Sequence, residues 1–140
     1  MAQLSNASFT MPLAQAGQIA DASNRTVDSY AAEGVIGFGK VVERGTTPDK
    51  QVRIFAGGVA AGITVFSHTE VTEQYEDGGS VAVISSGRVV VDTLDVEVAA
   101  GEPAHPYLDG GVTTSEHSPA PPIGTFLTSG TGLNVIQVEV

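Results

Sequence analysis

The chain lacks cysteine and tryptophan altogether. Without cysteine it can form neither a disulfide nor a thiolate metal site. Only 6% of its residues are aromatic, so a core must be built mainly from Val, Ile, Leu and Ala. No run of 18 apolar residues occurs, which excludes a membrane-spanning helix. Met1 to Ala20 has no basic flank and no continuous apolar stretch, so we expect no secretory signal.

Basic residues are also scarce. The chain has 6 Lys and Arg against 16 Asp and Glu, which gives a formal net charge of -10. Such a chain repels phosphate backbones and anionic headgroups, so nucleic acid and membranes are poor partners. Solubility is the simplest consequence of this charge.

Short β-branched runs separated by turn residues dominate the 140 residues, which fit one domain. The abundance of Gly, 17 residues, indicates many turns. We therefore predict an all-β fold, a jelly-roll-like sandwich or barrel of about eight to ten short antiparallel strands. The runs are Val41–Val42, Val52–Phe55, Ile63–Phe66, Val81–Ile84, Val89–Val91, Val96–Val98 and Leu133–Val140.

The last run is the clearest strand. From Ile136 onward, one face is apolar and the other is polar, as in a half-buried strand. Helical signals are few: only Thr69–Glu76 and Val27–Glu33 could hold a turn or two. Ser85–Gly87 and Ser129–Gly130 indicate turns between strands.

Two regions look irregular. Residues 1–16 are small and polar, and we interpret them as an N-terminal arm or lead-in before a single β domain, residues 17–140. Thr113–Pro122 contains Pro and Ser and is expected to be a loop without core residues.

Gly34–Val41 has the G-x4-G-K spacing of a phosphate-binding loop. Val41, however, stands where a Ser or Thr hydroxyl should bind magnesium. The residues after Lys40 also predict a strand, whereas a phosphate loop must open a helix. A glycine-rich turn leading into a strand is the better interpretation.

A metal site of the cupin type is a second possibility. His68 follows a predicted strand, and Glu70, Glu73 and Glu76 lie just beyond it. Histidine with carboxylates on a β-scaffold can bind iron, manganese or zinc. A cupin would need further histidines, yet His105 and His117 have Pro close by and fall outside strand-like runs. The alternative is an exposed acidic turn.

Other catalytic patterns are absent or isolated. There is no G-x-S-x-G elbow, and the pair Asp92 and Asp95 suggests no substrate cleft. Asn6–Ser8 and Asn24–Thr26 match a glycosylation pattern that has no weight without a secretory signal. We therefore assign no catalytic, cofactor-binding or metal-ligating residue and expect no cofactor.

Four segments in order make the chain resemble the structural cement, or decoration, proteins of tailed bacteriophages. The resemblance covers nearly all of the chain after Gly17. The segments are Gly17–Asp21; Ile36–Thr46 with Gln51–Arg53; Val81–Val91 with Val98–Ala104; and Gly124–Ser129 before the closing strand.

The resemblance implies a structural virion protein and not an enzyme. It implies a jelly-roll-like module that binds the outer surface of the phage head and stabilises contacts between major capsid protein subunits. It also implies homodimers that span neighbouring subunits, assembled in the host cytoplasm.

The arm carries Leu4, Phe9, Met11 and Leu13 in a segment too polar to form its own core. We predict that it lies across a neighbouring subunit. A first strand tucked into its own domain is the alternative.

Two other functions stay open at this stage. A tail, baseplate or receptor-binding β module would have a similar composition, and a small cupin-type metalloprotein could share the fold. Trimers or glycan binding would favour the first, and bound metal would favour the second.

Overall fold

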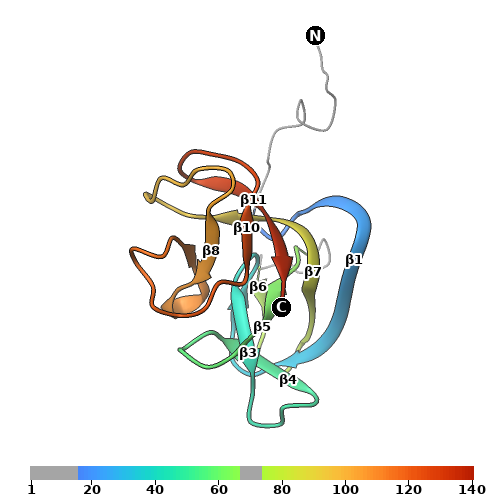
Figure 1. The fold of residues 1–140 in the computed structure, drawn as a ribbon. Coiled ribbons are helices and arrows are strands. Elements are labelled where there is room, and N and C mark those ends of the chain that lie inside the picture. Colours follow the sequence, from blue (N-terminus) through green and yellow to red (C-terminus); the bar gives the residue numbers. More distant parts are fainter. Residues whose placement is uncertain (1–15, 67–73) are drawn as a thin grey trace.

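A computed structural model describes residues 16–66 and 74–140. These residues form strands joined by turns, with one 3-10 turn, η2 (Leu108–Gly110), and no α-helix (Figure 1). Accordingly, the described part of the chain contains no helix able to cross a membrane. The strands are β1 (Ile19–Ala32), β2 (Ile36–Gly37), β3 (Val41–Arg44), β4 (Gln51–Ile54), β5 (Ala60–Thr64), β6 (Gln74–Tyr75), β7 (Ser80–Asp92), β8 (Pro103–Pro106), β9 (Val112–Thr113), β10 (Gly124–Phe126) and β11 (Leu133–Glu139).

The main sheet closes on itself and then continues to one side. Its order is β1-β4-β3-β5-β7-β11-β10-β8-β9, and β1 also pairs with β7. Strands β1, β4, β3, β5 and β7 therefore form a closed barrel, and β11, β10, β8 and β9 form an extension that starts from β7. The predicted all-β class is confirmed in its barrel form, and the jelly-roll description stays a prediction.

Alternation along the strands creates two hydrophobic cores. Val42 and Val83 point into the barrel, whereas their neighbours Val41 and Ile84 point toward the extension. The barrel core consists of Ala32, Ile36, Val42, Val52, Tyr75, Val81 and Val83. The second core consists of Val41, Phe55, Ile63, Val65, Ile84, Val89, Val91, Val98, Ala104, Val112, Ile123, Phe126, Ile136 and Val138.

Strand β7 is shared by the two parts of the fold. Its first half pairs with β5, its second half pairs with β11, and β1 runs along its other edge. The predicted turn at Ser85–Gly87 is therefore wrong, because ladders on both sides hold the strand extended. Ile84 and Val89, five positions apart, both face the second core, so the alternation shifts between them. Gly87, with φ of +136°, lies at this shift.

Four other expectations are corrected. Val27–Glu33 is no helical turn: Val27 to Ala32 belong to β1, whose backbone is paired with β7. Val96–Val98 forms no strand and contributes one bridge, from Val98 to Gly130. The strands are not all antiparallel, since β1 runs parallel to β4 where the barrel closes. Nor are they all short, since β1 and β7 have 14 and 13 residues.

Strand β11 confirms the predicted faces from Ile136 to Glu139, whereas Val140, predicted on the apolar face, is exposed. Ile136 and Val138 are buried, whereas Gln137 is half-buried and Glu139 is exposed. Asn134 is buried on the apolar face. Its Oδ1 accepts a hydrogen bond from Thr128 Oγ1 at 2.9 Å, and its Nδ2 lies 3.3 Å from Thr93 Oγ1.

Two glycines bring distant segments together at the start of the domain. Gly17 and Gly39 have φ of +85° and +70°, and their backbones touch. A Cβ on Gly17 would lie 2.8 Å from Gly39 N. The Gly17 amide donates to Val90 O at 2.7 Å, and Phe66 N donates to Gly17 O at 2.8 Å. The segment that follows the predicted arm is thus fixed to the barrel; residues 1–15 lie outside the described residues.

Candidate functional site

The glycine-rich segment Gly34–Val41 leads into the barrel strand β3, and its strand β2 pairs with β6 in a separate two-stranded sheet. It contains β2, a turn and the first residue of β3. Gly39 within it contacts Ala16 and Gly17, where a Cβ would meet Ala16 Cβ at 2.6 Å. Gly39 therefore permits close packing, and the segment precedes a strand, as the sequence predicted.

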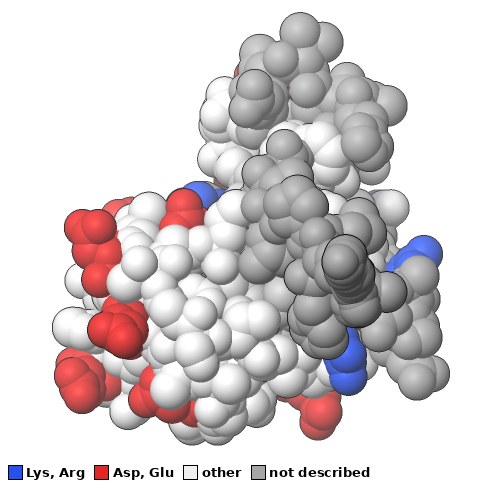
Figure 2. Space-filling model, turned by 90° about the horizontal axis from the view of Figure 1, so that it is seen from above, with Lys and Arg blue, Asp and Glu red and all other residues white. Residues whose placement is uncertain are grey.

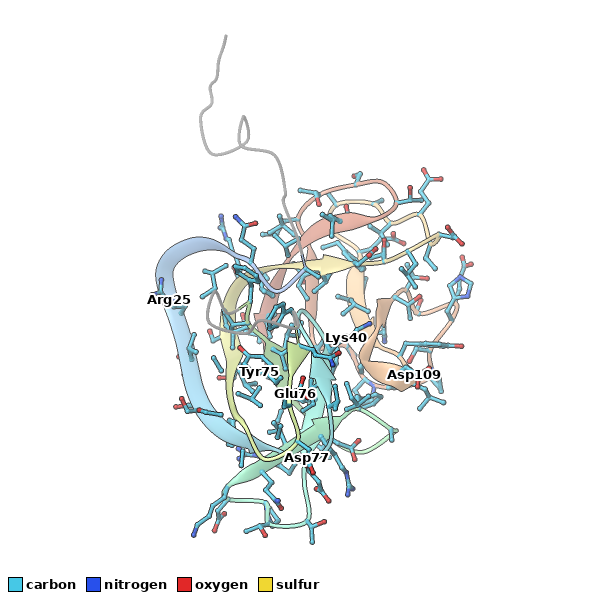
Figure 3. The ribbon with its side chains drawn as sticks, turned by 180° about the vertical axis from the view of Figure 1, so that it is seen from behind. Arg25, Lys40, Tyr75, Glu76, Asp77 and Asp109 are labelled. Atoms are coloured by element: carbon cyan, nitrogen blue, oxygen red, sulfur yellow. The ribbon has the colours of Figure 1, made fainter. Side chains whose placement is uncertain are left out.

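The residues considered for a cupin-type site do not come together in the described part of the chain. His68, Glu70 and Glu73 lie outside the described residues, and Glu76 is exposed beside β6 (Figure 3). His105 lies within β8 and is buried, which corrects the expectation that it falls outside a strand. His117 is exposed in a loop. Across residues 16–66 and 74–140, no three His, Cys, Asp or Glu side chains form a group that could bind a metal ion.

Asp92 is the last residue of β7, and Asp95 lies in the turn that follows it. Asp92 Oδ1 accepts a hydrogen bond from the Leu94 amide at 2.8 Å, which stabilises the left-handed Leu94, whose φ is +56°. Both carboxylates are exposed. The arrangement accounts for Asp92 without a catalytic role.

Charge is divided unevenly between barrel and extension. Arg88 is the last Lys or Arg in the sequence, whereas acidic residues continue to Glu139. Acidic side chains gather on one side of the view in Figure 2. Arg25 on β1 and Asp109 on η2 lie at opposite sides of the molecule in Figure 3. The extension thus carries negative charge alone.

Against this acidic background, one surface lacks charged side chains. Two hollows, of about 150 and 380 Å³, share Phe55 and Pro106 in their walls. None of their lining residues, all within the described ranges, is Asp, Glu, Lys or Arg. We call this surface the groove. Its lining residues are Phe55, Gly57, Gly58, Val59, Ala60, Pro106, Tyr107, Leu108, Ser118, Pro119, Ala120, Pro121, Pro122, Ile123 and Val140.

The groove carries large apolar side chains that face solvent. Val59 is 84% exposed, and Tyr107, Leu108 and Val140 are each about half exposed. Single exposed hydrophobic residues are ordinary, but a contiguous hollowed group of them indicates a binding surface. The sequence alone does not reveal this surface, because its residues come from separate parts of the chain.

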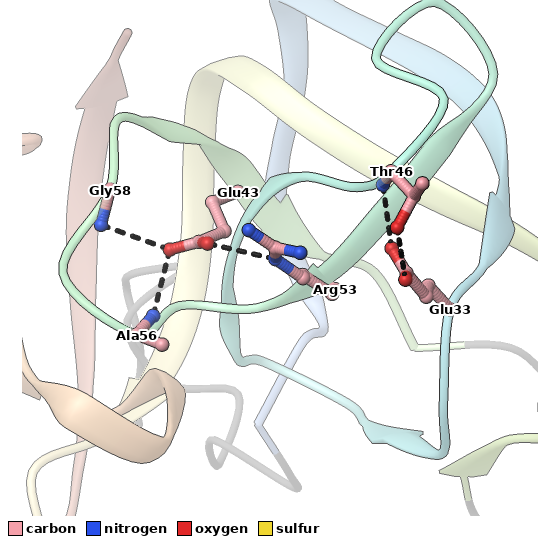
Figure 4. A network of polar contacts seen from close by, with 6 residues as sticks. All are labelled: Glu33, Glu43, Thr46, Arg53, Ala56 and Gly58. Carbon is pink, nitrogen blue, oxygen red and sulfur yellow. Dashed lines mark hydrogen bonds and ion pairs between the residues drawn. The ribbon is translucent and has the colours of Figure 1, made fainter.

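A buried carboxylate shapes the β4–β5 loop that forms one wall. Glu43 on β3 is 5% exposed, and its Oε1 accepts hydrogen bonds from Ala56 N at 2.8 Å and Gly58 N at 3.0 Å (Figure 4). Arg53 Nε donates to Glu43 Oε2 at 2.9 Å. Burial raises the pKa of Glu43, but these hydrogen bonds and the Arg53 charge outweigh it and lower the pKa overall. The ionised carboxylate therefore holds the loop that presents Val59.

The opposite wall is fixed by polar contacts between β8 and the loop after β9. Ser118 Oγ donates to Pro106 O, and His105 Nδ1 donates to Ala120 O at 2.7 Å. Thr113, Thr114 and Ser118 are buried, but no residue of Thr113–Pro122 is a member of either hydrophobic core, as the sequence predicted. The Ser118 hydroxyl packs inward by donating to the Pro106 carbonyl, whereas Pro119, Pro121 and Pro122 remain at the surface.

The 3-10 turn completes this wall. Gly110, with φ of +78°, presses η2 against β3, since a Cβ there would lie 3.0 Å from Val41 O. Tyr107 and Leu108 are thereby presented beside Phe55. Hydrogen bonds and close backbone packing therefore hold both walls of the groove in place.

Together these features define a rigid all-β module with an apolar binding surface, in which none of the considered chemical sites is assembled by the described residues. The family described as structural cement protein (E217 gp24/Pam3 gp6) matches residues 3–140. The chain belongs to this family of phage structural cement proteins. It is therefore a structural virion protein associated with the capsid, and not an enzyme.

Solved structures agree with this fold. A chain from the capsid of Myoviridae phage XM1 has a TM-score of 0.74 at 18% identity, with 90% of each chain covered. The head fiber gp8.5 N base of bacteriophage phi29 has a TM-score of 0.58 at 12% identity, covering 82% of this chain and 94% of that one. No curated protein matches the sequence.

Proposed function

We propose that this protein binds the outer surface of the phage head and stabilises contacts between major capsid protein subunits. We further propose that it acts as a homodimer. Membership of the cement family over nearly the whole chain supports an attachment role.

The groove is the observation that carries this proposal. Interface centres are depleted in charged residues and enriched in aromatic and other apolar groups. The groove has this composition, on a chain whose net charge is -10. The acidic surface elsewhere limits non-specific association between crowded copies.

The rigidity of the module suits a fastening role. A closed barrel and two fixed groove walls lose little conformational freedom on docking, which keeps the entropic cost of binding low. A homodimer would use a self-complementary patch around a two-fold axis. Because it could occupy two sites on one head at once, modest affinity at each site would give strong attachment.

Residues 1–16 are proposed to act as an arm that crosses to a neighbouring subunit, outside the single β domain of residues 17–140. Deletion of residues 1–12 leaves Gly17 and its contacts with Val90 and Phe66 in place. We therefore expect the shortened protein to fold but to bind heads more weakly. Unchanged binding by a folded protein would remove the arm from the interface.

The direct test uses expanded heads that lack the protein. Purified protein is mixed with them, the heads are sedimented, and the bound protein is measured against the capsid subunit. We expect saturation at a fixed ratio and a higher rupture temperature for loaded heads. Absence of binding to heads of every maturation state would contradict the proposal and direct attention to the tail.

A point substitution links the groove to this assay. Val59→Asp places a charge on an exposed side chain in the groove, whereas Val35→Asp makes the same change at a half-exposed position outside it. We expect only Val59→Asp to weaken head binding. Equal binding by the two variants would show that the groove is not used.

A further inference from the structure

We infer that the groove binds the N-terminal arm of a second copy of this chain, with Phe9, Met11 and Leu13 facing its floor. The inference rests on the proposed function, because it requires copies held side by side on one head. It names the arm of a neighbouring copy as the occupant of the groove, so that the groove would strengthen head attachment by linking bound copies to one another.

The arm and the groove match in charge. Residues 1–15 contain no Asp, Glu, Lys or Arg, in a chain that has 22 such residues in all, 6 basic and 16 acidic. The groove likewise presents none of these side chains. A charged segment would lose hydration on entering an apolar hollow without gaining a partner. Because the arm has no charged side chain, it can enter the groove without this loss of hydration.

The apolar residues of the arm also have suitable spacing. Phe9, Met11 and Leu13 alternate with Thr10 and Pro12. Proline favours an extended conformation in the residue before it, and in an extended segment alternate side chains share a face at about 7 Å spacing. Two adjacent hollows with a common wall can accept successive side chains at such a spacing.

The arm is long enough to reach another copy. Fifteen extended residues span about 50 Å, whereas a domain of this size has a radius of gyration of only about 14 Å. The chain is fixed at Gly17 by backbone bonds to Val90 and Phe66. The arm can therefore extend beyond its own domain and reach a neighbouring copy without strain.

The absence of cysteine permits a clean cross-linking test on the full-length protein bound to heads. Met11→Cys and Val59→Cys single variants are mixed, loaded on heads, oxidised mildly and separated without reductant. A disulfide needs Cβ atoms about 4 Å apart, so it reports seating of the arm in the groove. We expect a covalent pair of unlike variants to dominate.

Matched controls use the same chemistry. Thr10→Cys lies on the other side of an extended arm, and Leu94→Cys is 70% exposed and outside the groove. We expect several times less product from Thr10→Cys with Val59→Cys, and from Met11→Cys with Leu94→Cys. Equal yields from all pairings would overturn the inference.

A double variant, Met11→Cys with Val59→Cys, shows whether the arm in a groove comes from the same chain or from another copy. Linked chains of two and more copies support the inference, whereas a closed single chain would show that the arm occupies its own groove and would overturn it. A benzophenone attached at Met11→Cys gives an independent reading. Capture of the major capsid protein, and not of groove peptides from another copy, would also overturn it.

The head assay keeps this outcome distinct from the proposed function. If the variants sediment with heads but no groove cross-link forms, the inference fails and the attachment role stands. If no variant or native protein sediments with heads, the attachment role fails, whatever cross-links form in free solution.

Discussion

The carboxylate of Glu43 is buried beneath the guanidinium of Arg53, with 2.9 Å between Glu43 Oε2 and Arg53 Nε. The Arg53 side chain is 47% exposed, whereas that of Glu43 is 7% exposed. The arginine therefore covers a charge whose other oxygen is bound to the amides of Ala56 and Gly58. This pair connects the barrel to the wall of the groove.

Glu43→Gln tests that connection. The amide removes the negative charge that Arg53 and the two backbone amides all contact, so we expect the free energy of unfolding to fall by about 1–3 kcal/mol. Urea denaturation measures the change. Glu97→Gln, on an exposed side chain, is the control and should have little effect. If the two variants were equally stable, the Glu43 carboxylate would have no structural role.

Stability should also depend on pH below the ordinary glutamate range. The pKa of Glu43 is lowered overall, and hydrogen bonds from the Thr46 side chain and amide lower the pKa of Glu33. For a carboxyl whose pKa is lower in the folded state, the stabilisation is complete above the unfolded pKa, here 4.5, and is lost as the pH falls through the folded pKa. We expect the melting temperature to drop below about pH 4.5. The drop should be smaller in Glu43→Gln, and identical pH profiles would contradict this assignment.

Gly17→Ala should destabilise the protein more than Gly78→Ala does. The two glycines have nearly the same φ, +85° and +83°, so alanine has a similar backbone cost at each. A Cβ on Gly17 meets Gly39 N at 2.8 Å, whereas nothing lies within 4 Å of one on Gly78. Left-handed alanine costs about 1–2 kcal/mol, and the difference between the melting temperatures of the variants isolates the clash. Equal melting temperatures would mean that the Gly17 contact adapts without loss.

Asn134→Ala should loosen the β10–β11 connection. It removes partners from the hydroxyls of Thr128 and Thr93 and from nearby backbone carbonyls in a buried position. We expect a loss of about 2 kcal/mol in the free energy of unfolding, measured by urea denaturation. Gln137→Ala, on the half-buried face of β11, should cost less. The reverse order would argue that Asn134 is dispensable.

The sequence was informative where one strand face meets one core. The alternation in β11 follows its burial closely, and the strand after Lys40 correctly argues against a phosphate loop. Local patterns did not predict the structure where pairing with sequence-distant strands determines it. Ser85–Gly87 has residues typical of a turn, yet pairing with β1 and β11 holds it within β7. The groove could not be anticipated, since Phe55, Pro106 and Val140 meet only after the barrel and extension have formed. The burial of Ser118 in the loop after β9 likewise depends on the Pro106 carbonyl, which β8 brings to it.

The sharing of β7 has a mechanical consequence. A pull on the extension enters the barrel along the covalent backbone of this strand, because β7 continues from one part into the other. Its ladders with β1 and β11 run along the direction of such a pull. Their hydrogen bonds would be strained together in shear, whereas a peeling force would break them one at a time. We therefore expect the module to resist tension that is applied between the barrel and the extension.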